Sequence, residues 1–393
     1  MRGRLRLLSR TVWLLGLISL FNDAASDMIY PLVPLYLVSV LMAGPRALGL
    51  IEGIAEAVSS LVKLAAGVFA DRMHRMRGWV IGGYTLAGIA RPLIGITTSW
   101  VGVLACRFAD RVGKGLRSAP RDALISASVA PSERGLAFGL HRAMDNLGAV
   151  IGPLAAAALL AAGISLREIF LLAAVPAVIV FVLVLAVPEP ARDPQLKSTP
   201  FRWNLAGLPP RFSRYLAVLA LFTLGNSSNM FLLMRARQLG LSELQVPLLW
   251  ALMSGFAALF STHLSGWSDR IGRSRLIVGG WSIYAVFYLI LGLLPPHPLL
   301  LWPMFAGYGV FLAATEGAEK ALVADLVPGA RAGTAFGWYN LVVGLMLLPA
   351  SVLFGWLWQH LSPLAAFGFS AGCALSAALL MVVWVRPGSP AAA

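Results

Sequence analysis

Two stretches of the chain carry one shared pattern: GVFADRMHRMR at residues 67–77 and SGWSDRIGRSR at residues 265–275. The same spacing relates GLAFG at 135–139 to GTAFG at 333–337, and PRDAL at 120–124 to AEKAL at 318–322. Three separate matches at one spacing indicate that the second half of the chain duplicates the first. Each half is therefore expected to fold in the same way.

The composition is that of a membrane protein. Of the 393 residues, 59% are apolar and 12% are charged, whereas soluble domains carry about 25% charged residues. Apolar runs of about 20 residues, each long enough to cross roughly 30 Å of hydrocarbon, recur along the chain. The twelve runs are 11–41, 47–70, 78–97, 100–125, 134–162, 166–187, 214–239, 245–267, 274–294, 299–325, 332–360 and 363–385. The sequence thus predicts an all-α polytopic membrane protein with twelve transmembrane helices.

The duplication places six of these helices in each half. The predicted domains are a six-helix bundle over 1–187, a Pro-rich and basic cytoplasmic linker over 188–213, and a second six-helix bundle over 214–393. An even number of spans gives the two halves the same orientation, so a pseudo-twofold axis should run along the membrane normal. Transporters built from such repeats bind substrate near the midplane, between the repeats.

The formal net charge of +14 follows from membrane topology. More than half of the 31 Lys and Arg residues fall in alternate connections and at both termini, which predicts that both termini are cytoplasmic. A basic surface for nucleic acid is therefore not expected. The only cysteines, Cys106 and Cys373, lie inside predicted helices, so neither a disulfide framework nor a thiolate metal site is expected.

Nine basic and nine acidic side chains remain within the predicted helices. Each would be costly in contact with lipid, so together they should line a polar interior. At about 100° per residue they gather on single helix faces. The four faces are Asn22, Asp23, Asp27 and Tyr30; Glu52, Glu56 and Lys63; Arg107, Asp110, Arg111, Lys114, Arg117, Arg121 and Asp122; and His141, Arg142, Asp145 and Asn146. The alternative is that individual charges only brace helices against each other.

Most of these charges lie in the first half, which predicts that the coupling ion is handled there. The candidate proton-coupling residues are Asp23, Asp27, Arg107, Asp110 and Asp145. The second half offers uncharged polar groups that suit contact with a substrate. The candidate substrate-binding residues are Asn22, Tyr30, Glu52, Glu56, Arg111, His141, Arg142, Asn226, Asn229 and Glu316.

The duplicated basic loop resembles the G-x-x-x-D-R-x-G-R-x-R loop of the major facilitator superfamily, and the resemblance extends over the whole chain. It implies two pseudo-twofold-related six-helix bundles that work by alternating access. In that family the loop Asp latches the cytoplasmic gate at a helix N-terminus, where a carboxylate is stabilised by up to about 2 kcal/mol. The implied gating residues are Asp71, Arg72, Arg75, Asp269, Arg270 and Arg273.

Two further motifs suggest the antiporter branch that exchanges drugs or metabolites for protons. Gly139, Gly148 and Gly152-Pro153 resemble the family's antiporter motif, with ordinary small-residue packing as the alternative. Arg107-Phe108 resembles the buried fourth-helix arginine that modulates a neighbouring carboxylate. We expect Asp23 or Asp27 to titrate, with Arg107 as its modulator; the alternative is that Arg107 forms a structural ion pair.

Arg121-Asp122 and Glu319-Lys320 occupy equivalent positions with opposite order of charge. They are predicted to close the inner gate as cross-half pairs, Arg121 with Glu319 and Asp122 with Lys320. The alternative is pairing within each half.

The sequence predicts a secondary active transporter, a proton-coupled antiporter that exports a small organic solute. It is expected to act as a monomer in the cell membrane, without a cofactor or bound metal and without enzymatic activity. Two alternatives change the cargo. The cations of the fourth helix suit a phosphorylated or carboxylated metabolite, and Asp23, Asp27, Glu52, Glu56 and His141 suit a divalent metal or its chelate. A non-transporting membrane scaffold would not require a charged interior.

Overall fold

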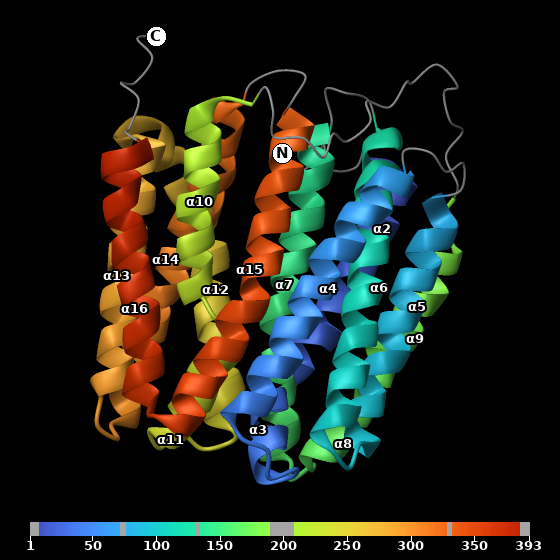
Figure 1. Ribbon diagram of the computed structural model, residues 1–393. Helices are drawn as coiled ribbons and strands as arrows, with labels where there is room; N and C mark the ends of the chain where they lie inside the picture. The colour runs from blue at the N-terminus through green and yellow to red at the C-terminus, as the bar shows by residue number, and fades with distance from the viewer. Residues whose placement is uncertain (1–7, 71–75, 130–133, 189–207, 328–331, 386–393) are drawn as a thin grey trace. The chain divides into compact units, whose positions relative to one another are not determined.

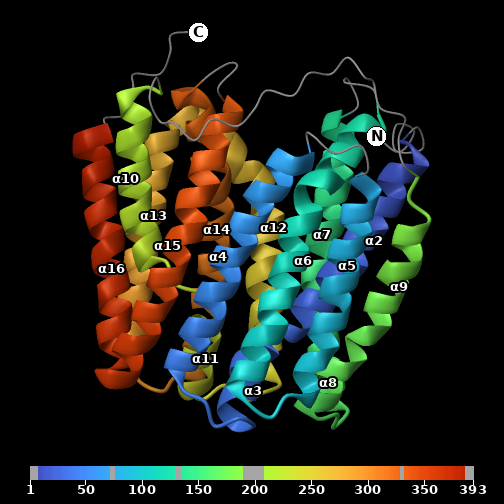
Figure 2. The same ribbon diagram turned by 45° about the vertical axis from the view of Figure 1, so that its right-hand side comes forward.

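A computed structural model describes residues 8–70, 76–129, 134–188, 208–327 and 332–385. These residues form a series of long α-helices (Figures 1 and 2). In the first half they are α2 (Arg10–Ile29), α3 (Leu32–Ser39), α4 (Pro45–Ala70), α5 (Met76–Leu93), α6 (Trp100–Ala127), α7 (Arg134–Ala161), α8 (Leu166–Leu172) and α9 (Ala174–Leu185). In the second half they are α10 (Pro210–Gly225), α11 (Met230–Gln238), α12 (Gln245–Ile271), α13 (Arg273–Leu293), α14 (Pro298–Leu326), α15 (Ala332–His360) and α16 (Pro363–Leu380).

The twelve predicted spans are confirmed, because each of them is occupied by one helix or by two consecutive helices. Nine segments of the described chain are long and apolar enough to cross a membrane on length and composition alone. Helix α6 shows why hydropathy alone gives fewer membrane-spanning segments than the fold contains. It is 28 residues long, but the charged residues of the buried ion pairs described below lower its mean hydropathy.

Three spans are interrupted where the sequence analysis expected continuous helices. The first breaks between α2 and α3 next to Pro31, and the sixth changes from α8 to α9 at Ala173. The seventh is broken between α10 and α11, where the backbone of 226–229 leaves the helical pattern. A break inside the membrane must satisfy its backbone groups with nearby side chains, and the polar sequence NSSN at 226–229 provides such side chains.

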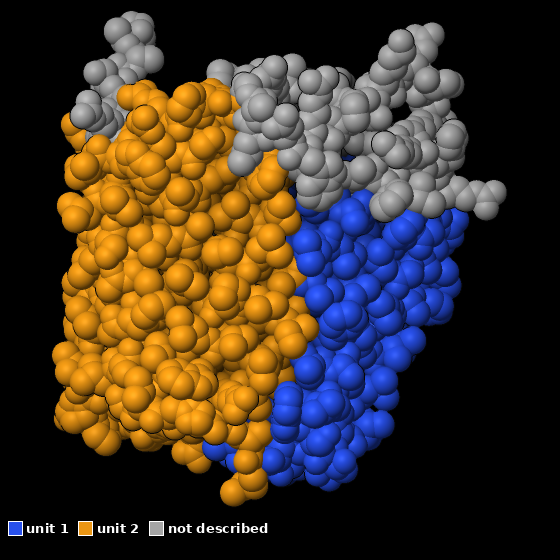
Figure 3. Space-filling view, viewed as in Figure 1, with its two compact units in different colours: residues 1–41, 58–200, 243–251 blue, residues 42–57, 201–242, 252–393 orange. Residues whose placement is uncertain are grey.

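The chain divides into two compact units (Figure 3). The first unit comprises residues 1–41, 58–200 and 243–251, and the second comprises 42–57, 201–242 and 252–393. Two stretches therefore group differently from the halves expected from the sequence. The start of α4 packs with the second unit, and the start of α12 packs with the first.

In the first unit, α2 packs along α7 and also contacts α9, while α5 packs along α6. Small residues allow the α2–α7 contact to be close. A Cβ atom added at Gly148 would lie 2.5 Å from the carbonyl oxygen of Leu20, and one added at Gly152 would meet the carbonyl oxygen of Ala24. Gly148 and Gly152 of the predicted antiporter motif thus lie against the segment of α2 that carries Asp23 and Asp27.

In the second unit, α13 packs against α14 and α16, and α10 packs against α15 and α16. The core is aromatic: Tyr284 stacks on Tyr288 with ring centroids 4.1 Å apart, and Phe222 stacks on Trp281 at 4.3 Å. The start of α4 contacts α15 at Gly53, where an added Cβ atom would lie 2.9 Å from the carbonyl oxygen of Leu348. This close approach explains why residues 42–57 belong to the second unit.

Candidate functional site

An ionic cluster occupies the interior of the first unit, centred on Asp110 of α6. Arg91 of α5 donates from Nε to Asp110 Oδ1 at 2.9 Å, and Arg111 donates from Nη1 to Oδ2 at 3.1 Å. Arg107, one helical turn earlier, lies 3.6 Å from Oδ2. All four side chains are at least 95% buried. Removing one partner of a buried pair of this kind costs about 3–5 kcal/mol, so the cluster fixes α5 against α6.

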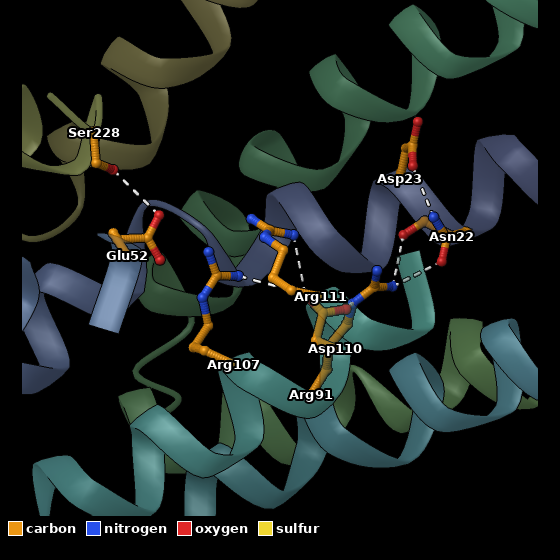
Figure 4. Close-up of polar contacts among 8 residues, drawn as sticks. All are labelled: Asn22, Asp23, Glu52, Arg91, Arg107, Asp110, Arg111 and Ser228. Atoms are coloured by element: carbon orange, nitrogen blue, oxygen red, sulfur yellow. Dashed lines mark hydrogen bonds and ion pairs between the residues drawn. The ribbon is translucent and has the colours of Figure 1, made fainter. Parts of the chain in front are cut away.

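The cluster continues to Asp23 on α2 (Figure 4). Arg91 Nη1 donates to the backbone and side-chain oxygens of Asn22, both at 3.0 Å. The Asn22 amide in turn donates to Asp23 Oδ1 at 2.8 Å. A continuous chain of hydrogen bonds therefore joins Asp110 to Asp23 across α6, α5 and α2.

Asp27 lies one turn further along α2 and has a neutral partner. The indole of Trp250, at the start of α12, donates to Asp27 Oδ1 at 3.3 Å. The same Trp250 ring packs on Tyr30 with ring centroids 4.6 Å apart, and the guanidinium of Arg107 lies 5.9 Å from the Tyr30 centroid. Within the described residues, neither Asp23 nor Asp27 forms an ion pair, and both accept hydrogen bonds from neutral groups.

Asp145 and His141 form a second polar group on α7. The Ser19 hydroxyl of α2 donates to Asp145 Oδ1, and His141 Nδ1 lies 3.5 Å from Oδ2. His141 is buried, whereas Arg142 is exposed. Of the α7 side chains predicted to bind substrate, His141 therefore faces the interior of the unit and Arg142 does not.

Arg117 of α6 is the least compensated of the buried cations. It is 4% exposed, and its guanidinium carbon lies over the Tyr84 ring of α5, 4.5 Å from the centroid. No hydrogen bond or ion pair is formed by Arg117 within the part of the chain that the structure describes, and its Nη1 is fully buried. A cation–π contact stabilises by about 0.5–2 kcal/mol, less than the several kcal/mol that a buried uncompensated charge costs.

The second unit brings polar groups to the break between α10 and α11. The Ser228 hydroxyl donates to Glu52 Oε2 at 3.2 Å, and the Ser228 backbone N–H donates to the Ser351 hydroxyl at 3.3 Å. The Tyr308 hydroxyl donates to Asn229 Oδ1 at 3.0 Å, and the Tyr284 hydroxyl donates to the Gly225 carbonyl at 3.0 Å. Two of these bonds satisfy backbone groups at the break, the Ser228 N–H and the Gly225 carbonyl. Glu52 is 1% exposed.

The remaining substrate-binding candidates have fewer described contacts. Asn226 ends α10, with its backbone N–H donating to the Thr223 carbonyl at 3.0 Å. Glu56 is half-buried on the same helix as Glu52. The side chain of Glu316 lies outside what the structure describes.

Arg121, Asp122 and Glu319 of the predicted inner gate have partners in their own unit. Arg121 donates to the adjacent Asp122 at 2.9 and 3.0 Å. Glu319 accepts hydrogen bonds from the Trp281 indole and the Tyr339 hydroxyl, both at 3.0 Å. Lys320 is exposed. Pairing across the halves stays a prediction.

The basic loops are described only in part. Arg273, at the start of α13, lies 2.9 Å from Asp325 of α14 and donates to the Ala321 carbonyl. Asp71, Arg72 and Arg75 lie outside the described residues, as do the side chains of Asp269 and Arg270.

Two residues with a clear place in this network, Arg91 and Trp250, had no assigned role in the sequence analysis, and Arg117 appeared there only among the cations of the fourth helix. Arg91 links the Asp110 cluster to α2, Trp250 is the donor to Asp27, and Arg117 is buried without a counter-charge. Both Arg91 and Arg117 belong to the nine basic residues inside the predicted helices, but the sequence does not indicate their partners. The sequence carries no signal that distinguishes Trp250 from an apolar core residue.

The structure and the site define a class of protein. Bundled transmembrane helices with a charged interior in one unit are expected of a carrier that moves a polar solute across the membrane. Within the described residues, no group of three or more His, Cys, Asp or Glu side chains is arranged to hold a metal ion. The chain is therefore a multi-pass membrane transporter.

Comparison with known proteins defines the family. The family model of the Major Facilitator Superfamily matches residues 15–266 and 215–393. The chain belongs to this superfamily and is a secondary transporter. It is 34% identical over 384 residues to an uncharacterized MFS-type transporter of Methanocaldococcus jannaschii, covering 96% of this chain and 95% of that protein. It is 28% identical over 361 residues to an uncharacterized protein of Mycobacterium tuberculosis, covering 89% and 87% of the two chains.

Solved structures have the same fold. A POT family transporter in complex with 5-aminolevulinic acid superposes with a TM-score of 0.79 at 13% identity, covering 95% of this chain and 96% of that one. A bacterial homologue of the human lysosomal transporter Spinster, inward-facing and occupied, gives a TM-score of 0.71 at 18% identity, covering 97% and 98%. At these identities the likeness establishes the fold alone.

Proposed function

We propose that the protein is a proton-coupled antiporter that exports a small organic solute. It acts as a monomer in the cell membrane with both termini cytoplasmic. The observation that carries this proposal is the pair of carboxyl groups on α2, Asp23 and Asp27, whose hydrogen bonds within the described residues come from neutral donors.

The carboxyl groups of the first unit differ in what protonation would do to their neighbours. Neutralising Asp110 would leave three buried guanidinium groups without their shared counter-charge, which is strongly unfavourable. Neutralising Asp27 would leave the neutral Trp250 indole as its partner and would strand no ion-paired cation. Asp110 is therefore suited to a fixed structural charge, and Asp23 and Asp27 are suited to carry a proton.

Proton binding at α2 has a route to the rest of the unit. The hydrogen-bonded chain through Asn22 and Arg91 connects Asp23 to the fixed charge at Asp110. Arg107 contacts Asp110 and lies over Tyr30, at the end of α2. A change of charge at Asp23 or Asp27 would alter the electrostatic energy of the Arg91 and Arg107 guanidinium groups. This link supports the role of Arg107 as a modulator.

The close α2–α7 contact supports the antiport direction. Gly148 and Gly152 of the antiporter-like motif lie against the backbone of α2 between Leu20 and Met28. The acidic side chains are thus placed on a helix whose packing partner carries the motif typical of exporters in this superfamily. A movement of α2 that follows proton binding would then be transmitted directly to α7.

The test is solute-driven proton movement in proteoliposomes. A pH gradient is imposed across the membrane and monitored with a pH-sensitive dye. Ethidium, succinate and arabinose are added as cationic, anionic and neutral probes. Further solutes are tested in the same way until one drives flux. We expect the wild-type protein to move protons across the membrane in one direction while the solute moves in the opposite direction. Asp27→Asn should abolish the dependence on the gradient while solute exchange at equal pH continues.

The matched control is Glu168→Gln, which neutralises an exposed carboxylate on α8 of the same unit and keeps a side chain that suits a capping box. It should retain gradient-driven flux. Gradient-driven flux that survives in both Asp27→Asn and Asp23→Asn would refute the assignment of the proton to α2. Co-movement of solute and protons in the same direction would refute antiport.

A further inference from the structure

Arg117 is a permanently charged group in the interior of the first unit without a paired anion. It is 4% exposed, and within the described residues its one direct interaction is the cation–π contact with Tyr84. An arginine is not deprotonated in proteins. An anion that approaches it would therefore compensate its charge directly.

The carboxylates nearest to Arg117 are engaged elsewhere. Asp110 and Asp23 act on it electrostatically, but Asp110 is shared by three other arginines and Asp23 accepts from the Asn22 amide. Neither forms an ion pair with Arg117 in the described chain. Water at this position would supply hydrogen-bond acceptors but no negative charge.

Two further buried polar atoms of the first unit are also unsatisfied. The Tyr84 hydroxyl of α5 and His141 Nε2 of α7 are buried and have no hydrogen-bond partner within the described residues. Asp23 lies within electrostatic range of both Arg117 and His141. Unsatisfied buried polar groups are rare in native structures and point to an unseen polar partner. Here the Tyr84 ring contacts Arg117, and His141 shares with Arg117 an electrostatic interaction with Asp23.

We propose that Arg117 binds the anionic group, a carboxylate or a phosphate, of the transported solute, and that the Tyr84 hydroxyl is a second donor to it. The guanidinium offers a planar fork of N–H groups that matches either anion in a bidentate arrangement. Its contact with the Tyr84 ring orients that fork before the anion arrives. This inference rests on the proposed transport function and names the substrate class: an organic anion.

The test is thermal unfolding of the purified, detergent-solubilised protein at constant ionic strength. The probes are inorganic phosphate and succinate, with choline chloride as the cationic comparison. We expect phosphate or succinate at saturating concentration to raise the Tm of the wild-type protein by at least about 2 °C and choline to leave it unchanged. Arg117→Gln should remove the shift, and Tyr84→Phe should weaken it. Arg117→Lys keeps the charge without the fork and should give an intermediate shift.

The matched control is Arg167→Gln, which removes an exposed cation on α8 of the same unit. It should keep the full anion shift, which separates binding from the general stabilisation that phosphate gives to folded proteins. The inference is overturned if neither anion shifts the wild-type Tm, or if the shift survives in Arg117→Gln. If Arg117→Gln does not fold, an anion shift equal to that of the wild-type protein in Arg117→Lys and Tyr84→Phe would overturn it. These readouts need no pH gradient, so failure here is distinguishable from failure of proton coupling at Asp27.

Discussion

Replacing Asp110 with asparagine removes a carboxylate that contacts three buried arginines and leaves the side-chain volume almost unchanged. Arg91 and Arg111 would lose charge-assisted hydrogen bonds of 2.9 and 3.1 Å, and Arg107 its contact at 3.6 Å. Breaking a buried ion pair by removing one partner costs about 3–5 kcal/mol. Because 1 kcal/mol shifts the Tm of a domain of 150–250 residues by about 2–4 °C, we expect the Tm to fall by about 6–20 °C.

The assay is thermal unfolding of the purified protein in detergent, with Asp122→Asn as the control on the same helix. Asp122 bonds to Arg121, but its side chain is 50% exposed, and exposed pairs contribute up to about 1 kcal/mol. The control should therefore lose at most about 4 °C. Adding Arg111→Gln to Asp110→Asn should restore part of the loss, because one fewer buried guanidinium has lost its contact with a carboxylate. Equal losses in Asp110→Asn and Asp122→Asn would show that the buried cluster does not hold α5 and α6 together.

Three further substitutions test packing and hydrogen bonding by the same measurement. Gly152→Val places side-chain atoms against the Ala24 carbonyl, and such overpacking should cost about 1–3 kcal/mol. Trp281→Phe removes an indole donor from buried Glu319 and should cost about 1–3 kcal/mol. Ser165→Ala removes the exposed capping box of α8 and should cost about 1 kcal/mol. A larger loss in the Ser165 variant than in the Trp281 variant would contradict the argument from burial.

The positions of the spans could be predicted because a membrane helix needs about 20 apolar residues and little else. The interruption at 226–229 could not, because averaging hydropathy over a span hides four polar residues in its middle. The break depends on partners that are distant in sequence, such as Ser351 and Tyr308. The local sequence around 226–229 does not predict those long-range contacts.

The charged faces of the first unit follow from helical periodicity, but the partners within them do not. Periodicity places Arg107, Asp110 and Arg111 on one side of α6 without indicating that Arg91 of α5 completes the cluster. Arg91 is recognisable as a charge inside a predicted helix, but it has no charged neighbours on that face, so no pattern indicates its partner. The donor to Asp27, Trp250, belongs to a helix from the second half of the sequence. Such pairings arise from tertiary packing and become visible only in three dimensions.

The grouping of residues 42–57 with the second unit has a consequence for synthesis of the protein in pieces. A fragment that stops in the linker would contain Gly53 but not Leu348, and Glu52 but not Ser228. Conversely, a fragment that starts in the linker would carry Trp250 without Asp27. Each piece would expose a helix segment whose partners reside in the other polypeptide. Co-expression of both pieces should therefore protect each of them from degradation, whereas either one made alone should be cleared by cellular quality control.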